Sequence, residues 1–258
     1  MQLITDTEFQ GRRVVVEAED TLLSDPADDR IQVLGHRGAP AAGIAENSVA
    51  AVSRALDQGA DGVEIDVWLV GDGTLVCAHD LAGADVTSLA TLPDLLAAAQ
   101  RPTGARVVVE AKPVADATVA RATADALAAV LQTSAGCADI TISSFDADLL
   151  ATIRATCADL PVRTALLGEK ADPADDVVGR AHRDGHDEVH LSVDAVRRSP
   201  LAVTTARWLG LSVALWTVND REGLSWAAEL GVDAVITDDV LVARDELDRA
   251  ADAVPAAA

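Results

Sequence analysis

The sequence predicts a single (β/α)₈ barrel, or TIM barrel, with a short N-terminal extension and a small hairpin after its second strand. Eight short, apolar, β-rich runs each precede an Ala/Leu-rich segment of helical periodicity, which is typical of a parallel sheet with helical crossovers. The 258 residues fit one barrel of about 250 residues. Four Trp, two Phe and no Tyr require an aliphatic core, which suits the layered interior of a parallel barrel.

The eight units can be placed along the chain. The expected strands are Gln32–Leu34, Gly62–Leu69, Arg106–Glu110, Ile140–Ser143, Val162–Leu166, Glu188–Leu191, Ser212–Trp216 and Ala234–Ile236. The helices that follow them are expected at about Ser48–Gln58, Leu92–Gln100, Asp116–Gln132, Ala147–Ala155, Ala174–Asp184, Pro200–Leu209, Arg221–Leu230 and Asp239–Ala250. Eight units favour closure into a barrel, and a doubly wound open sheet is the alternative.

Local signals mark the ends of several elements. Ser48 and Asp116 lie where N-caps are expected, and Gly231 follows a helical pattern, as C-terminal caps do. A Gly-Asp-Gly turn should lead to a short extra strand, Leu75–Ala78. A further strand is expected at Val14–Glu17. We expect an N-terminal extension at residues 1–30, the barrel at residues 31–250 and a frayed tail at residues 251–258.

Charge and composition limit the partners. The formal net charge of −22 should repel nucleic acid and anionic membranes, and an anionic substrate would need local positive charge or a metal ion. Three scattered cysteines without a C-x-x-C pair indicate reduced thiols. The N-terminus lacks a signal-peptide pattern, and no apolar run approaches about 18 residues. We therefore expect a cytoplasmic protein without an integral membrane segment, and its oligomeric state is left open.

Three acidic residues indicate a metal site at the barrel mouth. Glu64 and Asp66 lie two residues apart in a strand, so both side chains point to one side, while the apolar residues between them should face the helices. Two carboxylates about 6–7 Å apart repel each other and are costly to bury. A hard divalent cation removes that cost, and Glu110 could supply a third oxygen. The alternative is salt bridges from these acids to Arg37 and Lys112.

Two histidines and two cations end neighbouring strands. His36 and His79 could act as an acid–base pair, because imidazole exchanges protons near neutral pH. The sequence does not decide which histidine is the acid. Arg37 offers a planar fork for phosphate oxygens. Lys112, one of only two lysines, could contact the phosphate or pair with the acids.

Seven sequence blocks, in order, resemble the glycerophosphodiester phosphodiesterase family. They are H-R-G-A-P-x5-E-N-S (His36–Ser48), G-A-D-G-V-E-I-D-V (Gly59–Val67), D-G-T-L-V-C-A-H-D (Asp72–Asp80), V-E-A-K (Val109–Lys112), S-S-F-D (Ser143–Asp146), W-T-V-N (Trp216–Asn219) and G-V-D-A-V-I-T-D (Gly231–Asp238). The resemblance runs from about residue 33 to residue 240. Several linked blocks are far more specific than any one of them alone.

The resemblance implies a barrel enzyme that hydrolyses glycerophosphodiesters, as small-molecule substrates, to an alcohol and glycerol 3-phosphate. It implies a divalent metal cation, Mg²⁺ or Ca²⁺, with the ligands Glu64, Asp66 and Glu110. The implied acid–base pair is His36 and His79. The implied contacts to phosphate and substrate are Arg37, Lys112, Trp216 and Asn47. The nucleophile would be water or the substrate's own 2-hydroxyl, which would give a cyclic phosphate.

One departure from the family pattern leaves the identity of the substrate open. The family pattern carries a longer insertion before the second barrel helix, whereas only Leu81–Thr91 fill that gap here. The alternatives are a phospholipase-like enzyme that stops at the cyclic phosphate, a lysophospholipase D acting on a related phosphodiester, or a catalytically silent metal-dependent binding protein.

Other signals are expected to be structural. Three histidines recur every fourth residue from His182 to His190, but a glycine and a strand interrupt the helix, so a metal site is not expected there. Cys77 is expected to be a buried, inert thiol. Trp208 and Trp226 lie in helical patterns and are expected to pack against the core.

Overall fold

The computed structural model describes residues 7–9, 12–14, 30–100, 104–134 and 139–253. The chain divides into two units, residues 1–30 and residues 31–258. In the first unit, β1 (Thr7–Phe9) pairs with β2 (Arg12–Val14) in antiparallel fashion. The expected strand at Val14–Glu17 lies outside the described residues, apart from Val14 at the end of β2. The expected tail also lies outside them from residue 254 onward.

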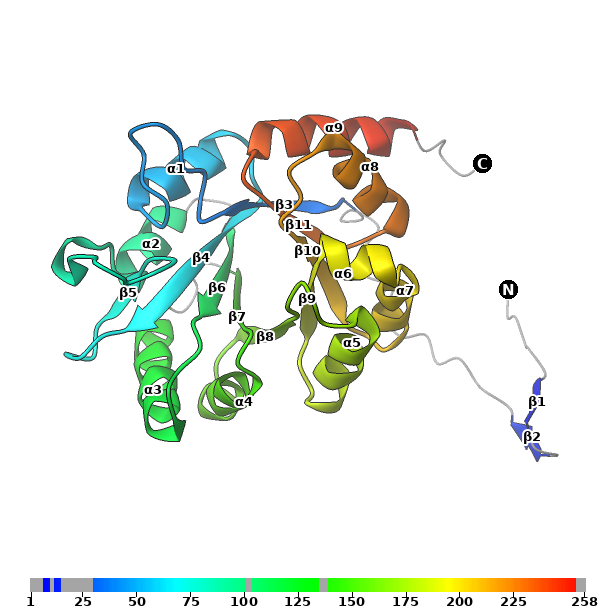
Figure 1. Ribbon diagram of the computed structural model, residues 1–258, viewed down its shortest axis with the longest axis horizontal. Helices are drawn as coiled ribbons and strands as arrows, with labels where there is room; N and C mark the ends of the chain where they lie inside the picture. The colour runs from blue at the N-terminus through cyan, green and yellow to red at the C-terminus, as the bar shows by residue number, and fades with distance from the viewer. Residues whose placement is uncertain (1–6, 10–11, 15–29, 101–103, 135–138, 254–258) are drawn as a thin grey trace. The chain divides into compact units, whose positions relative to one another are not determined.

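The second unit is a closed barrel of eight parallel strands surrounded by helices (Figure 1). The strands are β3 (Gln32–His36), β4 (Gly62–Leu69), β6 (Arg106–Ala111), β7 (Asp139–Ser144), β8 (Val162–Leu167), β9 (Glu188–Ser192), β10 (Ser212–Trp216) and β11 (Ala234–Thr237). Because β3 pairs with both β4 and β11, the ring has no open edge. The predicted TIM barrel is confirmed, and the open-sheet alternative is wrong.

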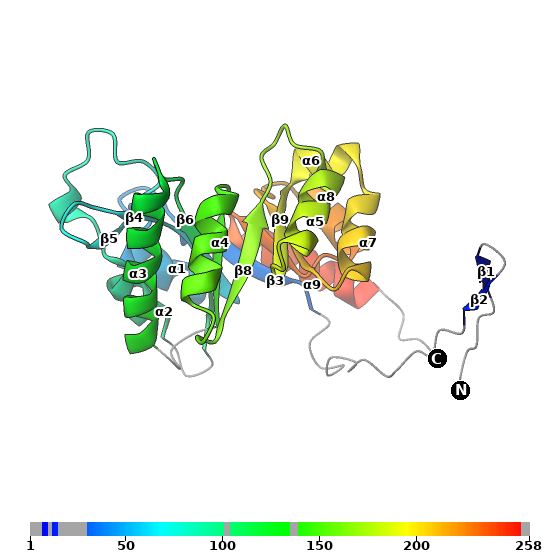
Figure 2. The same cartoon turned by 90° about the horizontal axis from the view of Figure 1, so that it is seen from below.

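Helices follow the strands and cover the outside of the ring (Figure 2). They are α1 (Val49–Asp57), α2 (Leu92–Ala99), α3 (Ala117–Thr133), α4 (Ala147–Thr156), α5 (Ala174–Arg183), α6 (Val193–Arg198), α7 (Leu201–Trp208), α8 (Arg221–Leu230) and α9 (Val240–Ala253). The bounds lie close to those predicted. The sequence did not predict α6 or the 3₁₀ turn η1 (Val86–Ser88), because both are too short to show helical periodicity.

The predicted caps and the predicted hairpin are present. The Ser48 hydroxyl accepts a hydrogen bond from the Ala51 amide at 3.1 Å, and Asp116 accepts one from Thr118 at 2.8 Å. Gly231 ends α8 at φ 66°, the left-handed conformation that glycine adopts without strain. The extra strand, β5 (Leu75–Cys77), pairs antiparallel with the end of β4, outside the closed ring.

The two faces of each barrel strand meet different surroundings. Outward residues of β4 (Val63, Ile65 and Val67) are fully buried in the core cluster beneath the helices, as the alternation predicted. The small apolar cluster inside the barrel consists of Leu34, Val108, Ala214, Ala234 and Ile236. Most of the remaining inward positions near β4, β6 and β9 are polar, so charged groups are concentrated inside the barrel.

Gly62 permits one close approach inside the barrel. A Cβ atom at this position would lie 2.0 Å from the Arg106 carbonyl oxygen, a separation that no side chain can accommodate. The glycine therefore lets β4 pack directly against β6, and the Arg106 side chain lies buried inside the barrel. The acidic residues of β4 follow two and four positions later, nearer the barrel mouth.

Other expectations have mixed outcomes. Trp208 is 84% exposed at the end of α7, so the packing predicted for it is wrong, because its side of the helix faces away from the core. Trp226 is partly buried against the core, with the Arg197 guanidinium over its ring at 5.9 Å. Cys77 and Cys157 are buried free thiols, and Cys137 lies outside the described residues. Among the described residues, no helix is both long and apolar enough to cross a membrane.

Candidate active site

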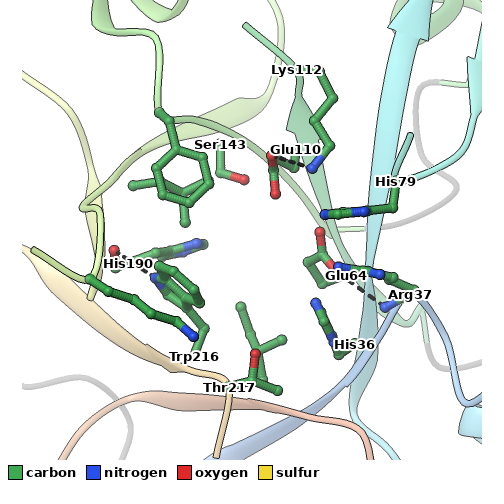
Figure 3. Close-up of a pocket in the computed structure, with 14 residues that line it drawn as sticks. His36, Arg37, Glu64, His79, Glu110, Lys112, Ser143, His190, Trp216 and Thr217 are labelled. Carbon is green, nitrogen blue, oxygen red and sulfur yellow. Dashed lines mark hydrogen bonds and ion pairs between the residues drawn. The ribbon is translucent and has the colours of Figure 1, made fainter. Parts of the chain in front are cut away.

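The carboxyl-terminal ends of the barrel strands surround a cavity of about 320 Å³ (Figure 3). Every barrel strand contributes a residue to its wall. These residues are His36, Glu64, Glu110, Ser143, Leu167, His190, Trp216 and Ile236. This is the end at which barrel enzymes place their catalytic groups. No residue of the short segment 81–91 lines the cavity.

Three predicted metal ligands meet on one side of the cavity. One oxygen each from Glu64, Asp66 and Glu110 lies within 4.8 Å of the other two. The Lys112 ammonium lies 2.5 Å from Asp66 Oδ1 and 2.6 Å from Glu110 Oε1. The structure therefore brings the acids together and also contains the predicted alternative, because Lys112 pairs with two of the three.

The positive charge of the protein compensates the three carboxylates of this cluster to different extents. Burial, together with repulsion from Asp66, raises the pKa of Glu64 from 4.5 to about 8. Burial also raises the pKa of Glu110, although Lys112 opposes that shift. For Asp66, burial acts in the same direction but Lys112 outweighs it, so its pKa is lowered. Glu64 is the carboxylate whose charge the protein compensates least.

Arg37 and Asn47 hold the acids in place from the β3–α1 loop. Asn47 Nδ2 donates to Asp66 Oδ2 at 2.8 Å, and the Asp66 amide donates back to Asn47 Oδ1 at 2.9 Å. The Arg37 amide donates to Glu64 Oε2 at 3.1 Å, and Arg37 Nε lies 3.4 Å from Asp66 Oδ2. Arg37 and Asn47 have φ values of 56° and 51°, in the left-handed region. Such strain outside glycine is concentrated at functional sites.

The two predicted catalytic histidines lie on the same side as the acids (Figure 3). His36 Nδ1 donates to Asp238 Oδ1 at 2.6 Å, and Asn219 Nδ2 donates to Asp238 Oδ2 at 2.6 Å. Burial acts to lower the pKa of His36, but the Asp238 hydrogen bond and the charge of Glu64 outweigh it, so the pKa is raised above 6.5. The Asp238 bond occupies Nδ1 and leaves Nε2 of this ring available for a ligand.

His79 has the opposite electrostatic surroundings. Burial and the charges of Arg37 and Lys112 lower its pKa below 6.5. It follows β5, and the hairpin that carries it is fixed by hydrogen bonds from Trp68 Nε1 to the Ala78 carbonyl at 3.0 Å and from the Cys77 amide to the Ala90 carbonyl at 2.8 Å. The pKa values of the two imidazoles are therefore shifted in opposite directions.

The opposite wall is aromatic with polar atoms at its base. Trp216 and Phe145 form an edge-to-face pair with ring centroids 5.6 Å apart and an interplanar angle of 83°. Trp216 Nε1 donates to the His190 carbonyl at 3.3 Å. His190 lies at this wall, and Ser143, the register partner of Glu110, lies between it and the acid cluster (Figure 3).

A second buried carboxylate, Glu188 on β9, lies deeper in the barrel. It accepts hydrogen bonds from Arg106, from Thr141 at 3.0 Å and from His190 Nε2 at 3.1 Å, and Arg163 Nε lies 3.1 Å away. Burial opposes ionisation, but these partners lower the pKa of Glu188 to about 2. This carboxylate is ionised and fully paired, as expected for a buried charge with a structural role.

Residues 36–95 and 82–242 match the model of the "Glycerophosphoryl diester phosphodiesterase family". The chain belongs to this family. The two matched segments overlap at residues 82–95, which include most of the segment where the sequence departs from the family pattern.

The names of individual relatives agree with this family assignment. A curated Mycobacterium tuberculosis protein, named "Probable glycerophosphodiester phosphodiesterase 1", is 49% identical over 69 residues, which are 24% of this chain. The matched region spans about a quarter of that relative's length, 25%. A glycerophosphodiester phosphodiesterase from Parabacteroides distasonis has a TM-score of 0.75 at 24% identity, covering 87% of this chain and 99% of its own. An Oleispira antarctica phosphodiesterase, solved with the product sn-glycerol-3-phosphate, has a TM-score of 0.71 at 22% identity, covering 85% and 97%.

Reasoning from the sequence missed four residues at the site of this family member. Asp238, Asn219 and Ser143 lie inside blocks that carried the family resemblance, so the blocks were the available signal, but nothing in the sequence gave each residue a role. His190 was placed on the expected strand Glu188–Leu191, but its chemistry was considered only within a histidine repeat where no metal site was expected. It lies on a strand and points inward, and among the described residues the histidine repeat forms no metal cluster.

Proposed function

We propose that this protein is a divalent-metal-dependent phosphodiesterase that hydrolyses glycerophosphodiesters to an alcohol and glycerol 3-phosphate. The observation that carries the proposal is one cavity in which three clustered carboxylates lie beside two imidazoles of opposite protonation tendency. Family membership supports the reaction class. The product bound to the Oleispira antarctica protein supports a small-molecule substrate of this kind.

The carboxylate cluster fits a hard divalent cation such as Mg²⁺ or Ca²⁺. Glu64, Asp66 and Glu110 would hold it, because their oxygens converge within 4.8 Å and Glu64 lacks enough positive charge from the protein. When bound, the ion supplies positive charge that polarises the phosphodiester and stabilises the charge developing during displacement.

Two cationic side chains of the protein bind the phosphate group of the substrate. The Arg37 side chain lies at the cavity wall and offers a planar set of donors, and the Lys112 ammonium lies between two acids at the same wall. On a chain of net charge −22, this local positive charge makes the cavity accessible to an anionic substrate. Asn47 keeps the Asp66 carboxylate oriented, and Trp216 forms the facing aromatic wall.

The histidines divide the proton transfers. His36, which keeps its proton to higher pH because of Asp238, donates it to the leaving alkoxide. His79, whose pKa is lowered, accepts a proton from the nucleophile, either water or the substrate's 2-hydroxyl. Asp238 stabilises the imidazolium of His36 and fixes the ring so that Nε2 is its reactive nitrogen.

The decisive experiment is a screen of divalent metals against glycerophosphodiesters, with enzyme-coupled detection of glycerol 3-phosphate. We expect turnover that chelation abolishes and that metal restores. Phosphorus NMR of the products separates full hydrolysis from arrest at a cyclic phosphate. Metal and ligand binding by calorimetry without hydrolysis under any metal would contradict the enzymatic proposal. Cell fractionation tests the cytoplasmic location that the sequence predicts.

A further inference from the structure

Two buried polar atoms at the base of the cavity have unused hydrogen-bonding capacity. Ser143 is 1% exposed and His190 is 0% exposed, and both line the cavity. Within the described part of the chain, neither Ser143 Oγ nor His190 Nδ1 has a hydrogen-bond partner. Figure 3 shows both side chains at the cavity, Ser143 beside Glu110 and His190 beside Trp216. A buried polar atom without a partner is costly, so such atoms at a cavity call for a functional explanation.

The strand geometry directs these two side chains to the same space. One layer deeper, Thr141 on β7 donates to Glu188 on β9 across β8, at 3.0 Å. Ser143 and His190 lie two residues further along the same two strands, so they point to the same side one layer closer to the mouth. Ala165, the inward residue of β8 paired with Ser143, ends at its Cβ atom and leaves the intervening space open.

The chemistry of the pair selects the ligand class. The ionised Glu188 accepts the Nε2 proton of His190, and burial lowers the pKa of this imidazole, so its Nδ1 is a bare acceptor. The Ser143 hydroxyl can donate or accept. An acceptor beside a hydroxyl complements an alcohol O–H. A quaternary ammonium offers no donor to Nδ1, and a phosphate oxygen would meet its lone pair.

We propose that Ser143 and His190 form a hydroxyl-binding subsite, which orients a hydroxyl-bearing part of the phosphodiester substrate between Glu110, the strand neighbour of Ser143, and the aromatic wall. This inference rests on the proposed function. The Trp216–Phe145 pair covers the carbon skeleton of the same group. A site of this kind rejects analogues that lack the hydroxyl, because its buried polar atoms then stay unpaired.

Two variants and one control test the subsite in the full-length, metal-loaded protein. Ser143→Ala removes the hydroxyl. His190→Gln removes the Nδ1 acceptor, while the glutamine amide still reaches Glu188 as a donor. Thr123→Val is the matched control, because Thr123 Oγ1 is also buried without a partner among the described residues but lies on α3, away from the cavity. Melting temperatures verify that each variant is folded.

Two ligand pairs locate the hydroxyl. Calorimetry compares glycerol 3-phosphate with propyl phosphate, which lacks both hydroxyls and reports on the glycerol end. Values of kcat/KM compare glycerophosphoglycerol with glycerophosphocholine and report on the headgroup end. We expect the wild type to prefer the hydroxyl-bearing member of at least one pair by about tenfold or more, as two hydrogen bonds would give. Ser143→Ala and His190→Gln should reduce that preference to about twofold, and Thr123→Val should retain it.

The outcomes separate the inference from the function on which it rests. If the wild type shows the preference and both subsite variants retain it in full, other groups recognise the hydroxyl and the inference is wrong. The same conclusion holds if the wild type is active but shows no preference in either pair. If the wild type neither binds glycerol 3-phosphate nor turns over any diester, the proposed function fails, and the subsite proposal fails with it.

Discussion

Glu64 on β4 and Glu188 on β9 are both buried inside the same barrel, yet their electrostatic surroundings are opposite. Glu188 is surrounded by two arginines, a threonine and a histidine, which lower its pKa to about 2. For Glu64, burial and the charges of two other acids raise the pKa to about 8, and its one backbone hydrogen bond does not offset them.

The difference distinguishes a structural charge from a functional one. A buried charge contributes to the fold only when its partners compensate the desolvation, as around Glu188. Around Glu64 that compensation is incomplete, and strained residues support the site. Clusters of this kind are typical of sites whose missing charge comes from a ligand. The two glutamates should therefore respond in opposite ways to substitution, pH and metal.

The largest expected effect is on turnover by Glu64→Gln. We expect kcat/KM to fall by about 10³-fold or more, because the amide removes a charged metal ligand. Coupled detection of glycerol 3-phosphate measures the loss, and calorimetry should show weakened metal binding. The exposed Glu229→Gln on α8 is the control and should retain full activity. Activity within tenfold of the wild type would exclude Glu64 from the mechanism.

Glu188→Gln should instead destabilise the protein. Its loss leaves the buried Arg106 guanidinium without its carboxylate, which costs about 3–5 kcal/mol in comparable buried pairs. Urea denaturation of the metal-free protein measures the change in the free energy of unfolding. Glu64→Gln, in the same assay, should be neutral or stabilising at pH 8. Equal destabilisation by both substitutions would remove the distinction between the two sites.

The pH dependence of stability should differ in sign between the two carboxyls. The folded Glu64 keeps its proton up to about pH 8 while the unfolded one loses it near 4.5, so metal-free stability from this group falls as pH rises through that window. Glu188 contributes stability above about pH 4.5, which is lost as pH falls towards 2. At pH 8, divalent metal at a hundred times its Kd should restore about 2.7 kcal/mol. Thermal denaturation across pH, with and without metal, measures both effects.

The smallest expected effect concerns the orientation of His36. Activity should fall as pH rises through the pKa of the acid, His36, and as pH falls through the pKa of the base, His79. Asp238→Asn removes the charge that helps to raise the His36 pKa, so the alkaline limb should move to lower pH. The pH profile of kcat/KM measures this shift of the alkaline limb. Movement of the acidic limb alone would reverse the assigned roles.

Local patterns in the sequence predicted most of the barrel and part of the site. Alternation along β4 was sufficient to place Glu64 and Asp66 on the inward face, because successive side chains in a strand point to opposite faces and the apolar residues between the two acids face the helices. The Asp238 partner of His36 lies 202 residues away, and only closure of the ring brings the two together. Glu188 and Arg106 meet across the barrel for the same reason.

His190 and Trp208 show why pattern alone was insufficient elsewhere. The predicted strand over Glu188–Leu191 is confirmed by β9, but alternation along it does not say that His190 lies at the same cavity as Ser143. Trp208 ends α7 with its side chain 84% exposed, which depends on how the helices pack around the ring. Both outcomes depend on tertiary arrangement, which periodicity does not encode.

The β4–β5 hairpin places His79 outside the closed ring, whereas His36 belongs to it. Three paired positions join β5 to β4, and Leu75 and Cys77 of β5 belong to the core cluster, so this arm is packed against the barrel without being part of its closed ladder. One imidazole therefore takes its position from the closed ladder and the other from a hairpin beside it, so a shift of the hairpin would change the separation of the two rings without changing the register of the barrel.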